Sequence, residues 1–129
     1  VEIYVAPTWD AGDSWIASMR HIAKEGGCWV LGTATAIQGK DVPEAFPQRD
    51  MLFDAEEWLN DGDAVVIKPM GEIAAGPLRR EKGILYAEID ANRARRARRT
   101  LDVSGHYARP DIFSLSVDRK PQTPVLFSD

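Results

Sequence analysis

Apolar and polar residues alternate at the start of the chain, from Val1 to Val5, and Pro7 follows shortly after. A period of two with a proline behind it predicts a β-strand over residues 1–6. A second β-prone segment, residues 28–37, is almost continuously apolar, which is typical of a strand covered on both faces. One helix fits between them, so the pattern predicts a strand–helix–strand unit.

The segment between these strands has the spacing of an amphipathic helix. Its apolar stripe consists of Trp15, Met19 and Ile22, with Ile16 and Ala23 beside them. Asp13 or Ser14 is the expected N-cap, because a side-chain oxygen there can accept a hydrogen bond from a free backbone N–H group. Gly26 and Gly27 are expected to end the helix.

Residues 38–63 are acidic and contain prolines, so they are predicted to form an insertion or a long surface loop. A short helix is predicted within it, over residues 54–59. The next apolar segments, 64–69 and 73–77, flank a turn and predict a β-hairpin.

Three further elements complete the prediction. Residues 84–89 are predicted to form a strand, and Asp90 is predicted to cap a helix over residues 91–101. The alternation in residues 112–117 predicts a last strand, and residues 120–129 form a tail. Together these elements predict an α/β fold with a mixed sheet and helices on at least one face.

The chain has 129 residues, of which 44% are hydrophobic and 28% charged, as expected of one folded domain. Its single cysteine excludes an intramolecular disulfide and a zinc site built from several thiolates. His21 and His106 lack metal-ligand spacing, so no metal site is expected. No apolar run approaches the roughly 20 residues that cross a bilayer, so no membrane partner is expected.

The chain begins within an alternating segment, without an initiator methionine and without a basic and apolar leader. We therefore expect a piece of a larger fold and, by default, a cytoplasmic location.

Charge is unevenly distributed along the chain. Residues 1–64 hold 4 Lys/Arg and 12 Asp/Glu, a net charge of −8, whereas residues 65–129 hold 12 and 8, a net charge of +4. Five arginines lie within residues 93–99, and such a cluster can contact phosphates of a nucleic acid. The chain is acidic overall, however, and has no aromatic RNA-binding motif. A solvated helix face, or one that meets acidic residues of another subunit, is the favoured interpretation.

Cys28 is the only candidate thiol nucleophile. It follows the end of a predicted helix, where the partial negative charge raises a thiol pKa, and it enters an apolar strand. We interpret it as a buried structural residue. His21 is interpreted as a packed or half-exposed helix residue, and His106 as a structural or interface residue. Nothing predicts burial of Glu56–Glu57, so the pair is interpreted as surface residues that aid solubility rather than as acid–base catalysts.

Five segments, in this order, resemble the nitrilases of the carbon–nitrogen hydrolase superfamily. They are VEIYVAPT (1–8), WIASMRHIA with EGGCWVL (15–23 and 25–31), PMGEIAAGP (69–77), GILYAEID (83–90) and GHYARPD (105–111). The last is similar to the Gly-His-Tyr-x-Arg-Pro-Asp signature of nitrilases. The resemblance implies an α-β-β-α sandwich, with residues 1–129 as the C-terminal portion of one domain, 38–63 as its insertion and 120–129 as its tail.

The resemblance also implies an activity, the hydrolysis of an organic nitrile to a carboxylic acid and ammonia through a covalent thioimidate, without a cofactor. The family's cysteine nucleophile, two glutamates and lysine all precede the segment that matches Val1, and Cys28 matches a different position. No catalytic residue is therefore expected in this chain, and the chain alone is predicted to be inactive.

Thr8 matches the family's Ala-Pro-Thr position near the substrate and is the candidate substrate-binding residue; a hydroxyl that caps its own loop is the alternative. Nitrilases often read Ser-Ala-Cys-Gln after the Gly-Gly-Cys strand, whereas this chain reads Gly32-Thr33-Ala34-Thr35-Ala36-Ile37-Gln38, a departure at the pocket wall.

Two other function classes stay open, a non-catalytic oligomerisation or scaffold piece and a nucleic-acid-binding module, although no nucleic-acid partner is expected. We predict a homo-oligomer, because an unpaired edge of the first strand invites another chain and the two halves carry opposite charge. The family uses the insertion and the C-terminal segments for subunit contacts. The narrow stripe of Ala94, Ala97 and Leu101 would let two such helices approach closely.

Overall fold

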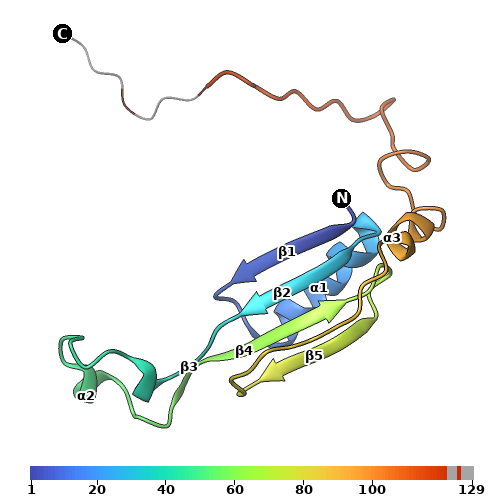
Figure 1. Cartoon of the computed structure of the whole chain (residues 1–129). Helices are drawn as coiled ribbons and strands as arrows, with labels where there is room; N and C mark the ends of the chain where they lie inside the picture. The colour runs from blue at the N-terminus through green and yellow to red at the C-terminus, as the bar shows by residue number, and fades with distance from the viewer. Residues whose placement is uncertain (122–124, 126–129) are drawn as a thin grey trace.

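A computed structural model describes residues 1–121 and residue 125; the rest of the predicted tail lies outside the described residues. The described residues form a mixed five-stranded sheet with one long helix on one of its faces (Figure 1). Strand order is β1-β2-β4-β3, and β5 pairs with β4. The predicted α/β class with a mixed sheet is confirmed.

The strand–helix–strand unit is also confirmed. β1 (Ile3–Thr8) and β2 (Trp29–Ala34) pair in parallel, and α1 (Gly12–Gly26) connects them. Ala6 and Val30 are buried in the core between α1 and the sheet. Trp29 points the other way and is buried on the opposite face, so β2 is covered on both faces as its composition predicts.

The C-terminal end of α1 is as predicted from the sequence, whereas its N-terminal end is not. Gly27 ends the helix with a left-handed φ of 55°, and its N–H group donates to carbonyl oxygens of the last turn. The predicted N-cap is wrong, because Ala11 occupies that position and Asp13 and Ser14 lie inside the helix. The apolar stripe is correct: Ile16, Met19 and Ala23 are buried, and Trp15 and Ile22 pack beside them.

The predicted insertion is shorter than expected. The short helix predicted over residues 54–59 is wrong, because residues 54–57 form a turn and β4 (Trp58–Ile67) begins directly after them. Residues 39–57, which we call the arm, project from the sheet (Figure 1) and contain the 3₁₀ helix η1 (Gly39–Asp41) and α2 (Arg49–Leu52). The expected single strand at 28–37 breaks before the arm, so that β3 (Ala36–Gln38) pairs separately with the start of β4.

The predicted hairpin is confirmed, with β5 (Ile73–Arg79) antiparallel to β4 and longer than expected. The predicted strand at 84–89 is wrong. That segment crosses the sheet face opposite α1 without forming a ladder, and its Leu85 and Ile89 pack on Trp29 and Val66 (Figure 1). The apolar positions are therefore used for packing rather than for strand pairing.

The strand predicted at 112–117 is also wrong. The segment lies away from the sheet, without a partner strand among the described residues, and Phe113 and Leu115 are exposed. Alternation in sequence makes a strand only where a neighbouring strand accepts the backbone hydrogen bonds.

α3 (Ala91–Ala97) is capped as predicted, since the Asp90 carboxylate accepts from the Asn92 N–H group at 2.9 Å, but it is shorter than expected. Ala94 and Ala97 are buried within the chain, Ala94 against the core that contains Trp29. The prediction that this stripe pairs two α3 helices is therefore wrong, because the stripe already packs internally.

Two arginines of α3 bind acidic groups of the same chain. Arg95 pairs with Glu2 at 2.7 Å and Arg96 with Asp90 at 2.9 Å. Both arginines are exposed, as the solvated-face interpretation expects, but their carboxylate partners belong to this chain rather than to another subunit. Among the described residues, no helix is both long and apolar enough to cross a membrane.

Candidate functional site at the carboxyl ends of the parallel strands

The two parallel strands end side by side, with Thr8 of β1 in register with Ala34 of β2. In open α/β sheets, ligands bind just beyond the carboxyl ends of parallel strands. The residues that follow Thr8, 9–11, connect β1 to α1 and are called the β1–α1 loop below. This end of the sheet is the candidate site.

Thr8 has a local role at this position. Its Oγ1 accepts a hydrogen bond from the Asp10 N–H group at 2.9 Å, and the Asp10 carboxylate in turn accepts from the Ala11 N–H group at 2.9 Å. The hydroxyl therefore caps its own loop, as the alternative interpretation of Thr8 expects. A role in substrate binding stays a prediction.

A fully buried carboxylate lies beneath the loop. Asp63 of β4 accepts hydrogen bonds from the Gly12 N–H group at 2.6 Å and from Arg79 Nε at 2.7 Å. Arg79 also bonds the exposed Asp13 at 2.7 Å. The hydrogen bonds to Asp63 and Asp13 raise the pKa of the Arg79 guanidinium above its ordinary range. Asp63 thus provides, from a distant strand, the helix cap that no residue of α1 supplies.

Asn60 holds the loop from the same strand. Its amide nitrogen donates to the Trp9 carbonyl oxygen, and its amide oxygen accepts from the Gly62 N–H group at 2.9 Å. The buried polar side chains among the described residues are Gln38, Asn60 and Asp63. Two of these three bind the β1–α1 segment.

The sheet face opposite α1 is hollowed near Ala34, at the carboxyl end of β2. A cavity of about 280 Å³ adjoins a more apolar one of about 290 Å³, and both are lined by Ala34, Ala64, Leu78 and Gly83. Thr35 and Lys82 line the first, and Leu31 and Leu85 the second. Thr8 lines neither cavity. Its register partner Ala34 lines both, so the hollow begins at the strand next to Thr8.

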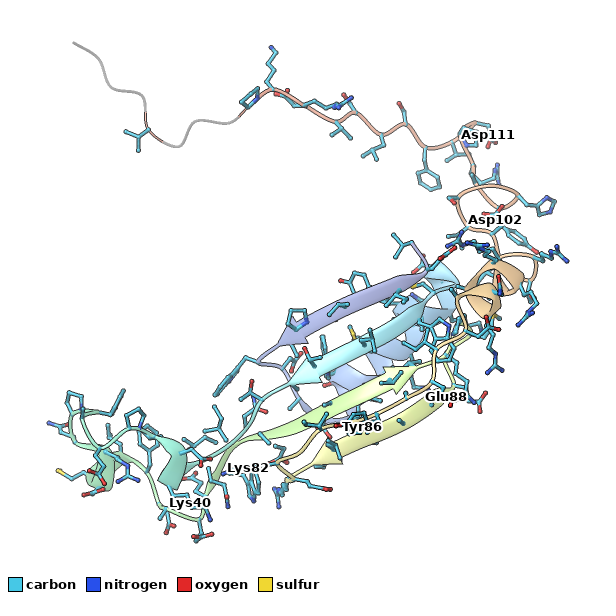
Figure 2. All side chains as sticks on the ribbon, in the orientation of Figure 1. Lys40, Lys82, Tyr86, Glu88, Asp102 and Asp111 are labelled. Carbon is cyan, nitrogen blue, oxygen red and sulfur yellow. The ribbon has the colours of Figure 1, made fainter. Side chains whose placement is uncertain are left out.

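Lys82 joins the edge of this hollow to the base of the arm. Its Nζ bonds the Asp41 carboxylate at 2.5 to 2.7 Å and lies 5.9 Å from the centre of the Trp58 ring. Lys40 binds Glu56 across the arm at 3.1 Å, and Figure 2 shows both lysines on this side of the molecule. The Lys82 hydrogen bond lowers the pKa of the Asp41 carboxyl.

Comparison with known proteins identifies the framework around this site. Residues 2–99 match the model of the carbon-nitrogen hydrolase family. The chain belongs to that family. A carbon-nitrogen hydrolase from Helicobacter pylori shares the fold, with a TM-score of 0.56 and 22% sequence identity over 76% of this chain and 35% of that one.

Several carbon-nitrogen hydrolases with curated names are close in sequence. An aliphatic nitrilase of Sinorhizobium fredii is 42% identical over 98% of this chain and 41% of its own length. Nitrilase 3 of Arabidopsis thaliana is 41% identical over 98% of this chain and 38% of its own. The chain spans about two-fifths of the length of these relatives. The matches do not bear out the expectation that it is only the C-terminal portion, since the family model covers residues 2–99.

A hydrolase needs a reactive side chain at its site, and the candidates considered from the sequence lie far from Thr8 or are unsuited to that role. Cys28 is 4% exposed and lies before the start of β2, whereas Thr8 lies at the other end of the parallel strands. Burial raises the pKa of its thiol, which disfavours the nucleophilic thiolate. His21 is exposed and contacts Glu25 at 3.0 Å, and His106 is exposed beside Tyr107. In the described part of the chain no cluster of His, Cys, Asp and Glu could hold a metal ion.

Asn60, Asp63 and Arg79 are not predicted as site residues by the sequence. Asp61-Gly62-Asp63 was included in the acidic insertion, whereas it is an irregular point within β4, where Gly62 and Asp63 have φ values of 90° and 71°. A glycine between polar residues in a strand often marks a bulge, and that signal could have placed the segment in the sheet.

Proposed function

We propose that this chain forms part of a nitrilase-type hydrolase, which converts an organic nitrile to a carboxylic acid and ammonia. One observation carries the proposal: relatives named nitrilases are 38–42% identical to the chain over 98–99% of its length. The likeness therefore extends past residue 99, where the family model ends. Some relatives are named bifunctional nitrilase/nitrile hydratases, so release of the amide is a second product to measure.

The reaction proposed requires a thiolate that adds to the nitrile carbon and forms a thioimidate. A first water then releases ammonia and leaves a thioester, and a second water hydrolyses the thioester to the acid and restores the thiol. Cys28 is the single thiol of the chain, and it is buried among Met19, Val30 and Ile67. Substrate could not reach its sulfur without opening the core. We therefore propose that the nucleophile, and with it the base and stabilising lysine that the nitrilase resemblance implies, come from outside this chain.

The contribution of this chain is a wall of the substrate site. Thr8 ends β1 at the edge where ligands bind in related α/β arrangements, and the β1–α1 loop begins there. The threonine methyl group or its hydroxyl would contact the substrate near the carbon chain. The loop-capping bond to Asp10 holds the hydroxyl in one orientation, which suits a group that shapes a pocket.

A second candidate function is non-catalytic, as an oligomerisation or scaffold piece of such a hydrolase. The buried thiol and the exposed apolar side chains of the arm, among them Met51 and Leu52, favour it. A homo-oligomer is part of both proposals, because the outer edge of β1 has no partner strand among the described residues.

Ammonia release separates these functions. The purified chain and the protein expressed from the complete reading frame are assayed with aliphatic and aromatic nitriles. We expect turnover by the complete protein only. Inactivity of both would favour the scaffold function. Turnover by the isolated chain that Cys28→Ala abolishes would show that the thiol is catalytic and would overturn the assignment of the nucleophile.

A further inference from the structure

We infer that Asp63 and Asn60 are positioning residues, which hold the β1–α1 loop in one conformation as a preformed wall of the site. The role in substrate binding rests on the proposed function. The positioning itself rests on the contacts of the two side chains and can be tested without a substrate.

The loop is bonded at each successive residue. Asp10 and Ala11 donate their N–H groups to Thr8 and Asp10, which are neighbours in sequence. These local bonds set the shape of the turn but leave it free to move as a unit. The Trp9 carbonyl oxygen and the Gly12 N–H group are instead bound by Asn60 and Asp63, each 51 residues away. The contacts from β4 therefore decide where the loop lies.

Asp63 occupies its position at a cost. Its side chain is fully buried, and its φ of 71° lies in the left-handed region that favours glycine. Burying a carboxylate carries a desolvation cost, which its hydrogen-bonding partners have to offset. Glycine would suit the backbone better. The backbone conformation thus gives no reason for an aspartate here, whereas its directed bonds to Gly12 and Arg79 do.

Arg79 extends the cluster to the neighbouring strand and to α1. Its guanidinium joins Asp63 of β4 to Asp13 of α1, at 2.7 Å to each carboxylate. The start of α1, directly after the loop, is therefore held to β4 and β5 through this cluster.

Hydrogen exchange of the chain tests the positioning. The variants are Asp63→Asn, which keeps the shape and an acceptor oxygen but removes the charge, and Asp63→Gly, which suits the backbone and removes both. Asp61→Asn is the matched control, because Asp61 lies on the same strand with a half-exposed side chain and pairs with the exposed Arg80. We expect amide exchange in residues 9–13 to rise about tenfold or more in Asp63→Gly, less in Asp63→Asn, and not in the control.

Exchange in β2 distinguishes positioning from general stabilisation, since it should stay unchanged in the Asp63 variants. A uniform rise across the chain, or no rise in residues 9–13, would overturn the inference. If both Asp63 variants fail to fold, Asn60→Asp provides the test instead. This variant keeps an oxygen that accepts from the Gly62 N–H group but loses the amide nitrogen that donates to the Trp9 carbonyl oxygen, so exchange in residues 9–13 should rise.

The substrate role has a separate readout. In a complete protein that hydrolyses nitriles, Asp63→Asn should raise KM at least several-fold more than it lowers kcat, because the loop binds substrate without taking part in bond breaking. An equal loss in kcat with KM unchanged would contradict that role. Absence of nitrilase activity would refute the proposed function and leave the exchange result to decide the positioning.

Discussion

Replacing Cys28 by alanine or serine tests whether the chain's single thiol is structural. The side chain is 4% exposed, and it packs in the core with Met19, Val30 and Ile67. Its sulfur also fills the space beside Gly26, where an added β-carbon would lie only 3.1 Å away. Alanine removes one heavy atom from this packed region. Serine keeps the size but places a hydroxyl group there.

The two substitutions differ in expected cost. Loss of one methylene-sized group and the small cavity it leaves costs about 1 kcal/mol of the free energy of unfolding. A hydroxyl without a hydrogen-bond partner costs about 1–3 kcal/mol. Serine should therefore be the more destabilising of the two. For a domain of this size, 1 kcal/mol corresponds to roughly 4 °C in Tm.

Urea unfolding of the three proteins measures these differences, and a thiol reagent measures access to the sulfur. Because burial raises the pKa of the Cys28 thiol, the folded protein should react far more slowly than the unfolded one. Rapid modification of the folded chain would refute the structural assignment. So would an unfolding free energy that neither substitution changes, since it would show that the sulfur does not pack in the core.

Four further outcomes are expected. Thr8→Val in a complete nitrile-hydrolysing protein should change relative rates across a panel of nitriles while changing stability by less than about 1 kcal/mol; identical relative rates would remove Thr8 from the site. Gly39→Ala should lower the free energy of unfolding by about 1–3 kcal/mol, because the new β-carbon would lie 1.9 Å from the Asp54 carbonyl oxygen at the base of the arm. Gly83→Ala is the control in the same unfolding assay and should leave stability unchanged, because an added β-carbon there meets open space. The hydrogen bond from Lys82 lowers the pKa of the Asp41 carboxyl below the ordinary 3.8. The carboxylate therefore stabilises the fold at pH values above about 4, and this contribution is lost as the pH falls through the lower pKa of the folded state. Amide chemical shifts of residues 39–41 should move below about pH 4 and stay constant between pH 6 and 8. Sedimentation across a concentration series should show a homo-oligomer that high salt weakens but does not abolish, and a folded monomer at high micromolar concentration would contradict the proposed assembly.

Local patterns in the sequence determined the elements whose structure depends on near neighbours. The stripe of α1 buries Met19 and Ala23 as its spacing predicts, and Gly27 ends that helix because a left-handed residue costs glycine little. The Asp90 cap follows in the same way. The parallel pair β1 and β2 was predictable for a different reason, because a helix connects the two strands. The motifs shared with nitrilases also lie within short segments, so the family was readable from the chain alone.

Tertiary structure alone decided the elements and contacts that need a distant partner. Residues 84–89 and 112–117 carry strand-like patterns, yet neither forms a ladder in the described chain, because pairing depends on an edge that the pattern cannot specify. Asp63 appeared to be one more acidic surface residue. Only folding brings its carboxylate to the Gly12 N–H group and to Arg79, because these partners lie 51 and 16 residues away, and only the tertiary structure buries it completely.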